Sequence, residues 1–186
     1  RLRNNLSVVA SLLRLQARQV SDPTARQALE AAGDRVRTLA LVQQDLQEAA
    51  RGPGPVLGEF AWRIVERHIA GSEELADRIA VRWAGDDFRL APEQVMPVGL
   101  IVNEWTALTL RGPLANCVEG SIHIRVRADE AGAMLLWADN GENRSADEPH
   151  ALSRAILDGL VLQIGGELRG AEAGLRWRLF VPRTAA

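Results

Sequence analysis

The first fifty residues carry the pattern that most constrains how this chain can fold. Apolar side chains near its start recur at steps of four, three and four, and a final step of three reaches a glutamine. This is the spacing of a seam in a helical bundle, so it predicts a helix over residues 1–20. The positions are Leu2, Leu6, Val9, Leu13 and Gln16.

A second helix is predicted from residue 23 to about residue 50, after a turn at 21–24. Asp22 is a candidate N-cap, and Pro23 suits the first helical position. Two long helices with a short connection form an antiparallel hairpin. A lone hairpin cannot bury both faces of its apolar stripe, so we expect a homodimer in which two hairpins complete a four-helix bundle.

The segment Arg-Gly-Pro-Gly-Pro at 51–55 breaks the helical pattern and divides the chain into residues 1–51 and 56–186. The second part alternates between helical and strand patterns, which predicts an α+β protein: a helical hairpin followed by an α/β sandwich with one sheet face covered. The expected helices are 56–70, 92–110 and 149–164. The expected strands are 78–83, 121–127, 133–138, 167–169 and 175–181, the last two forming a hairpin.

Composition limits the classes of function. A net charge of −2 argues against a nucleic-acid-binding surface, and without lysine no ammonium group is available to hold a nucleotide phosphate. The single Cys117 excludes an intramolecular disulfide and a cysteine-based zinc site, and the three histidines form no metal set by spacing. No apolar run approaches the ~20 residues that cross a bilayer, so we expect a cytoplasmic protein without a membrane segment.

The N-terminal residues Arg-Leu-Arg-Asn-Asn-Leu resemble a motif of one class of sensor histidine kinases. That motif reads His-Arg-Val-Lys-Asn-Asn-Leu and lies in the dimerisation and phosphotransfer helix, so the resemblance implies a phospho-acceptor His directly before Arg1. Arg3 would steady phosphoryl oxygens through its guanidinium fork, and Asn4 is implied to position a water for dephosphorylation. The implied partner is a response-regulator receiver domain. The alternative is that Arg3 and Asn4 only solvate the bundle.

The second part of the chain resembles the ATP-binding domain of histidine kinases, the Bergerat fold. The matching segments are 97–104, Asp139-Asn140-Gly141, 163–168 and 179–182. The resemblance implies that Asn103, Asp139 and Gly141 are remnants of a nucleotide site, in which Asp139 would accept a hydrogen bond from the adenine amine. The alternatives are that Asp139 only ends a strand and that Asn103 and Glu104 are buried polar groups satisfied locally.

Several departures from the family pattern fall on the residues that hold triphosphate. Leu108 stands where the family has its magnesium-binding Asn, and leucine has no oxygen to offer this cation. The first glycine box loses its second glycine at Asn143, and the second box becomes Leu152-Ser153-Arg154 without any glycine. Backbone N–H groups of such boxes cradle phosphate. We therefore expect no tightly bound cofactor.

Three functions remain open from the sequence. The first is a bacterial two-component protein that acts toward a response regulator as a dimeric phosphotransferase or phosphatase, or as a pseudokinase. The second is an active ATP-dependent sensor histidine kinase with a divergent pocket for ATP and magnesium. The third is a dimeric adaptor without enzymatic activity. The lost glycines and the leucine at 108 favour the first over the second.

Overall fold

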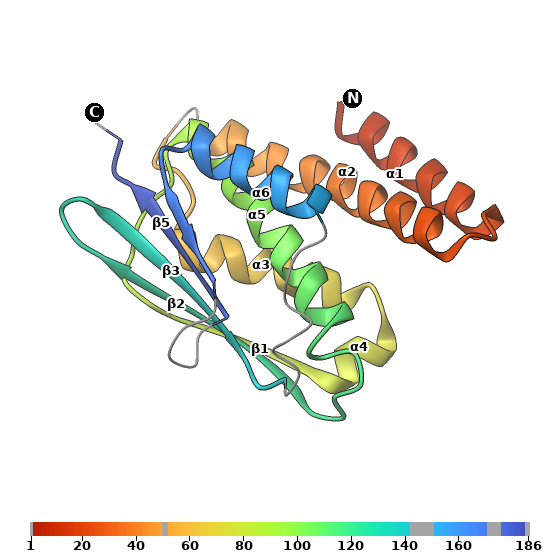
Figure 1. Ribbon diagram of the computed structural model, residues 1–186. Coiled ribbons are helices and arrows are strands. Elements are labelled where there is room, and N and C mark those ends of the chain that lie inside the picture. Colours follow the sequence, from red (N-terminus) through yellow and green to blue (C-terminus); the bar gives the residue numbers. More distant parts are fainter. Residues whose placement is uncertain (1, 50–51, 142–150, 171–175, 185–186) are drawn as a thin grey trace.

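The computed structural model describes residues 2–49, 52–141, 151–170 and 176–184. Helices α1 (Leu2–Gln19) and α2 (Pro23–Ala49) form the predicted hairpin at one side of the molecule (Figure 1). The predicted start of α2 is confirmed, because Asp22 Oδ1 accepts a hydrogen bond from the Ala25 N–H at 2.7 Å and Pro23 opens the helix. The cap satisfies a backbone donor that has no partner inside the helix.

Helix α1 carries two apolar stripes rather than one. Small residues face α2: Ala10 and Ala17 are buried, and Leu13 beside them is half-buried. The larger aliphatic side chains of Val8, Val9, Leu12 and Leu15 are 45–59% exposed. The residues of the predicted seam therefore lie on two faces of the helix, because Val9 is on the exposed stripe while Leu13 lies against α2.

The described residues form a mixed five-stranded sheet with the order β1-β2-β3-β5-β4. Strand β1 (Ile79–Gly85) pairs parallel with β2 (Gly120–Ala128), and the other pairs are antiparallel: β2 with β3 (Gly132–Asp139), β3 with β5 (Trp177–Pro182), and β5 with β4 (Glu167–Arg169). The predicted hairpin near the C-terminus is present as β4 and β5.

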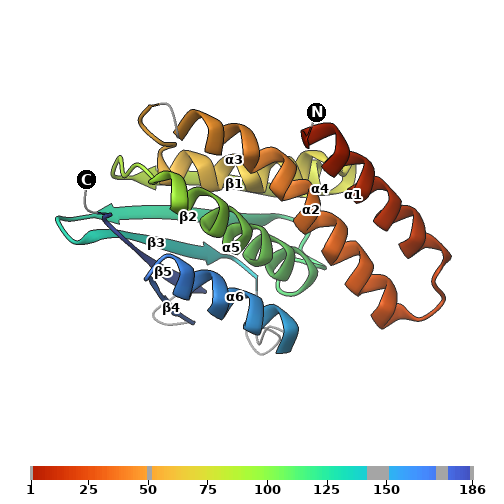
Figure 2. The ribbon, with the colours of Figure 1, turned by 90° about the horizontal axis from the view of Figure 1, so that it is seen from above.

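Three helices cover one face of this sheet, as Figures 1 and 2 show: α3 (Leu57–Ala70), α5 (Pro92–Arg111) and α6 (Ala151–Gln163). Helix α5 makes the crossover between the parallel strands β1 and β2. The hairpin packs outside this layer, with α2 along α5 and α1 along α2. The predicted α+β architecture with one covered face is confirmed.

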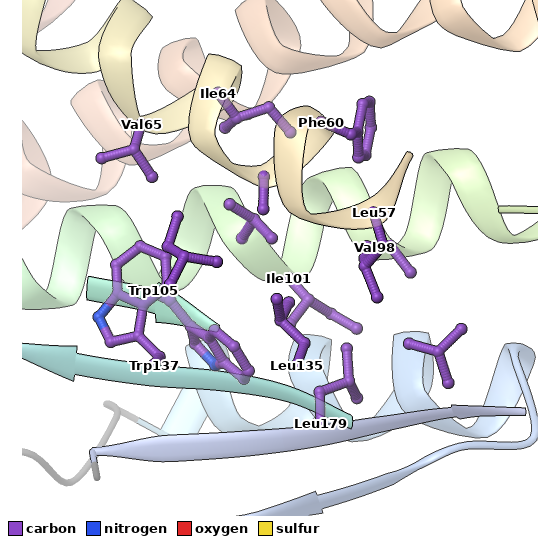
Figure 3. Close-up of a cluster of buried hydrophobic side chains, with 14 of the residues drawn as sticks. Leu57, Phe60, Ile64, Val65, Val98, Ile101, Trp105, Leu135, Trp137 and Leu179 are labelled. Atoms are coloured by element: carbon purple, nitrogen blue, oxygen red, sulfur yellow. The ribbon is translucent and has the colours of Figure 1, made fainter. Parts of the chain in front are cut away.

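The core lies between the sheet and the helices, and aliphatic and aromatic side chains from α3, α5, β3 and β5 fill it (Figure 3). It extends to the hairpin, because Val42 of α2 is buried in the same cluster. Gly99 allows this close approach: a Cβ at that position would lie 2.7 Å from Val42 Cγ2. The division at residue 51 stays a prediction, since α2 and the second part of the chain share a core.

One short helix was not expected from the sequence. Helix α4 (Glu73–Arg78) begins after Ser72, whose hydroxyl accepts a hydrogen bond from the Leu75 N–H at 3.4 Å. Glu73 and Glu74 lie in its first turn, where carboxylates interact favourably with the helix dipole. The helix has no buried apolar stripe that a sequence pattern could reveal, because none of its residues is buried.

Candidate functional site

Asp139 lies at the end of β3 with its side chain turned toward the covered face of the sheet. Its carboxylate is fully buried and forms a two-point ion pair with Arg176, whose side chain is only 4% exposed. Arg176 Nε binds Asp139 Oδ2, and the second guanidinium nitrogen donates to Oδ1 at 2.8 Å. The Gly141 N–H also donates to Oδ1, at 2.9 Å. Both carboxylate oxygens therefore have donors from the chain itself.

Strand pairing places Arg176 at this position. The Arg176 N–H donates to the Trp137 carbonyl at 2.8 Å, which continues the β3–β5 ladder by one residue beyond the Trp137–Trp177 pair. Arg176 could not be predicted from a local pattern, because 37 residues separate it from Asp139 and only the antiparallel register brings them together. The arginine beside an apolar strand was the only available signal.

Three indole rings pack together around the residues that carry the ion pair. Trp105 of α5 stacks on Trp177 with ring centroids 5.4 Å apart, and it meets Trp137 edge-on at 5.8 Å. The Trp137 Nε1–H donates to Thr109 Oγ1 at 3.1 Å. Trp137 lies two residues before Asp139, and Trp177 directly follows Arg176. This aromatic cluster therefore gives the ion pair a surrounding of low polarity, where an unpaired charge is costly.

Gly141 follows Asp139 where the chain passes close to the end of α5. A Cβ at Gly141 would lie 2.4 Å from Pro113 Cβ and 2.6 Å from the Pro113 carbonyl oxygen. The glycine is therefore required by close packing against Pro113. That structural requirement is present whether or not the residue ever approaches a nucleotide.

Asn103 and Glu104 lie on the side of α5 that faces α2. Thr38 Oγ1 donates to Asn103 Oδ1 at 2.5 Å, and Arg35 holds Glu104 through two contacts of 2.6 and 3.0 Å. Asn103 is buried, and the Glu104 side chain is 3% exposed. The structure thus engages both residues with the hairpin, which matches the alternative that they are buried polar groups with protein partners.

The other positions of the expected nucleotide site offer little to a metal or a phosphate. Leu108 is half-buried against the core, and Ser153 lies within the first turn of α6. Glu142 and Asn143 lie outside the described residues. Among the described residues, no three His, Cys, Asp or Glu side chains gather as a metal site. The described residues therefore do not fit magnesium-bound ATP: the Asp139 carboxylate is engaged internally, and Leu108, which the resemblance aligns with the family's magnesium ligand, has no oxygen to offer.

The predicted phosphotransfer residues lie at the other end of the molecule, in the first turns of α1. Arg3 and Asn4 belong to this helix, but their side chains fall outside the described residues. Their predicted roles therefore stay predictions. The structure does not bring them to Asp139, because the hairpin carries α1 away from the sheet (Figure 1).

Comparison with known proteins supports the resemblance at both ends of the chain. A family model described as "Histidine kinase" (HisKA_2) matches residues 1–53. The sensor histidine kinase PdtaS of Mycobacterium tuberculosis is 31% identical over 176 residues, which is 92% of this chain and 33% of that protein. The chain thus spans about a third of the length of this curated relative.

Solved structures of the same kind share the fold. The histidine kinase domain of the blue-light activated histidine kinase EL346 of Erythrobacter litoralis matches with a TM-score of 0.65 and 21% identity, covering 97% of this chain and 92% of that domain. The catalytic domain of histidine kinase ThkA matches with a TM-score of 0.53 and 14% identity, covering 69% and 94%. Within the described residues, no helix is long and apolar enough to span a membrane.

Proposed function

The chain is a histidine-kinase-like protein of two-component signalling, and from that premise we propose that it does not use ATP as a kinase would. It acts in the cytoplasm toward a response regulator, as a dimeric phosphotransferase or phosphatase or as a pseudokinase. The observation that carries this proposal is the buried ion pair between Asp139 and Arg176. The carboxylate that resembles the family's adenine acceptor is already bound by a guanidinium of the same chain.

The energetics favour Arg176 over an adenine amine as the hydrogen-bonding partner of Asp139. An adenine amine is a neutral donor, whereas Arg176 offers two charge-assisted hydrogen bonds, which are roughly twice as strong as neutral ones. An incoming adenine would also have to displace a guanidinium that is 4% exposed and leave it without its anion. ATP and magnesium, which the family resemblance implies as ligands, therefore have a poor site here.

The exposed apolar stripe of α1 supports the dimer. Val8, Leu12 and Leu15 follow the steps of four and three that place side chains on one helix face, and Val9 lies beside them. Four large aliphatic side chains on one exposed stripe favour burial against a second hairpin. The resulting four-helix bundle would present the N-terminal end of α1 to a receiver domain.

Two measurements on the full-length protein test the proposal. Calorimetric titration with MgATP is expected to show no saturable binding. A receiver domain phosphorylated with acetyl phosphate is expected to lose its phosphoryl group faster when the protein is added, through transfer or hydrolysis. The proposal is wrong if the protein binds MgATP at micromolar concentration and labels itself from its γ-phosphate, and if Asp139→Asn abolishes that labelling.

Sedimentation equilibrium tests the dimer separately. The substitution pair Leu12→Glu and Leu15→Glu places two carboxylates on the exposed stripe and is expected to give a monomer. The charge-matched pair Ser7→Glu and Ser11→Glu changes exposed residues of the same helix outside the four aliphatic positions and is expected to stay dimeric. A wild-type protein that sediments as a monomer would contradict this part of the proposal.

A further inference from the structure

The second face of the sheet is free of helices in the part of the chain that the structure describes, and it is strongly basic. Helices α3, α5 and α6 all lie on the opposite face (Figure 2). Four exposed side chains of β1 and β2 point away from those helices, and we call them the outer basic face: Arg82, His123, Arg125 and Arg127. They lie together because the parallel pairing sets Arg82 beside His123.

The arginines of this face lack an anionic partner among the described residues. Within the described residues, Arg82, Arg125 and Arg127 form no side-chain hydrogen bond or ion pair. The only outward-facing carboxylate of the five described strands is Glu167, which binds Arg169 at the distant edge strand β4. Like charges gathered on one sheet face are destabilising. A chain with a net charge of −2 nevertheless concentrates arginines here.

A hollow of about 480 Å³ lies within this face. Its rim carries Arg82, His123 and Arg125, and small or apolar side chains lie between them: Ala84, Ala138 and Leu136. Strand register explains the shape, because Ala138 pairs with His123 and Leu136 pairs with Arg125, so the long basic side chains stand beside short ones. The hollow therefore offers an apolar floor beside two arginines and a histidine.

The pattern of charge and apolar area distinguishes between classes of anionic partner. A membrane surface requires exposed large apolar side chains that insert, but the exposed ones among the described residues lie on α1, α6 and at Val118, none on this face. Single-stranded nucleic acid is typically bound by basic grooves with aromatic side chains for stacking, and the lining of the hollow offers only Trp83, which packs back onto Gly58 of α3.

We propose that the outer basic face binds an acidic segment of a partner protein, with one aliphatic side chain of that segment seated over Leu136. Carboxylates at alternate positions of an extended segment lie about 6.8 Å apart, which matches the spacing of His123, Arg125 and Arg127 along β2. The site is separate from both the hairpin and the Asp139 carboxylate, so it does not depend on the function proposed above.

Fluorescence anisotropy with a labelled synthetic peptide tests this proposal. The probe repeats Glu-Ser-Glu-Ser-Leu-Ser, which in extended form places two carboxylates at alternate positions and one leucine on the same side. The full protein is expected to bind it saturably. The double substitution Arg82→Gln with Arg125→Gln is expected to weaken binding about tenfold, since each exposed ion pair contributes about threefold. Raising the salt concentration is expected to weaken it further.

Matched variants distinguish the effect of the outer basic face from the effect of the protein's total charge. The double substitution Arg18→Gln with Arg67→Gln removes the same two charges from exposed positions of α1 and α3, and it is expected to keep the wild-type affinity. Ala138→Leu fills the hollow without changing charge and is expected to weaken binding. Circular dichroism checks that each variant is folded.

Three results would overturn the proposal. The first is an equal loss of affinity in the Arg18 and Arg67 variant. The second is equal binding of a Lys-Ser-Lys-Ser-Leu-Ser peptide, which would mean that charge does not select the partner. The third is tighter binding of single-stranded DNA or of phosphatidylserine vesicles than of the acidic peptide, because either would assign the face to another class of partner.

Discussion

Replacing Arg176 with methionine is the sharpest test of how strongly the buried ion pair with Asp139 stabilises the protein. Methionine keeps most of the aliphatic volume and removes the guanidinium, so a fully buried carboxylate loses its cation and keeps only the Gly141 N–H among its described donors. Breaking one side of a buried ion pair costs about 3–5 kcal/mol. Because that one hydrogen bond remains, we expect a loss near the lower limit, about 3 kcal/mol.

Urea unfolding followed by circular dichroism measures this loss, with thermal unfolding as a second measurement. For a chain of this size, about 3 kcal/mol lowers Tm by roughly 6–12 °C. The second substitution Asp139→Leu in the same background removes the stranded charge. The double variant is therefore expected to be more stable than Arg176→Met alone, since an apolar pair can replace a buried ion pair with little loss.

Arg169→Met provides the matched control. Arg169 also pairs with a carboxylate, Glu167, but both side chains are 59% exposed. Solvent and salt screen such a pair, so the expected change is about 0.5 kcal/mol. The prediction is wrong if Arg176→Met destabilises the protein no more than Arg169→Met does. It is also wrong if Asp139→Leu makes the Arg176 variant still less stable, because either result would mean that burial does not make this ion pair costly to break.

Two further substitutions test the packing around the site. Gly141→Ala is expected to lower stability by about 1–3 kcal/mol in urea unfolding, because its Cβ would overlap Pro113, whereas Gly159→Ala, with no atom within 4 Å of the new Cβ, is expected to be neutral or stabilising. Arg35→Met leaves the Glu104 carboxylate buried at 3% exposure and is expected to cost about 3 kcal/mol, with faster hydrogen exchange in α2; unchanged exchange there would contradict the role given to this pair.

Periodicity made most of the architecture predictable, for identifiable reasons. Strand β2 alternates between apolar and polar residues because one face of the sheet is covered and the other is not, and α5 is long and apolar because the core surrounds it. Helix α4 escaped prediction because its six residues bury no side chain. So short a helix without a buried face leaves no apolar period in a sequence.

The candidate site was predictable only in part. Asp139 could be found because it ends a buried strand and begins a short recognisable motif. Its partner could not be found, since the Arg176 contact depends on the register between β3 and β5 rather than on any local pattern. The engagement of Asn103 by Thr38 was equally hidden, because it joins residues 65 positions apart across two segments that composition divides.

The two polar contacts between α2 and α5 make one mechanical unit of parts that the chain order separates. Arg35–Glu104 and Thr38–Asn103 lie one turn apart on α2 and are sheltered from water, so sliding or tilting α2 must rupture both at once. A displacement of the hairpin would therefore be transmitted to α5, which both contacts join to α2. A bend between the hairpin and α5 would have to occur in α1 or in the part of α2 that precedes Arg35.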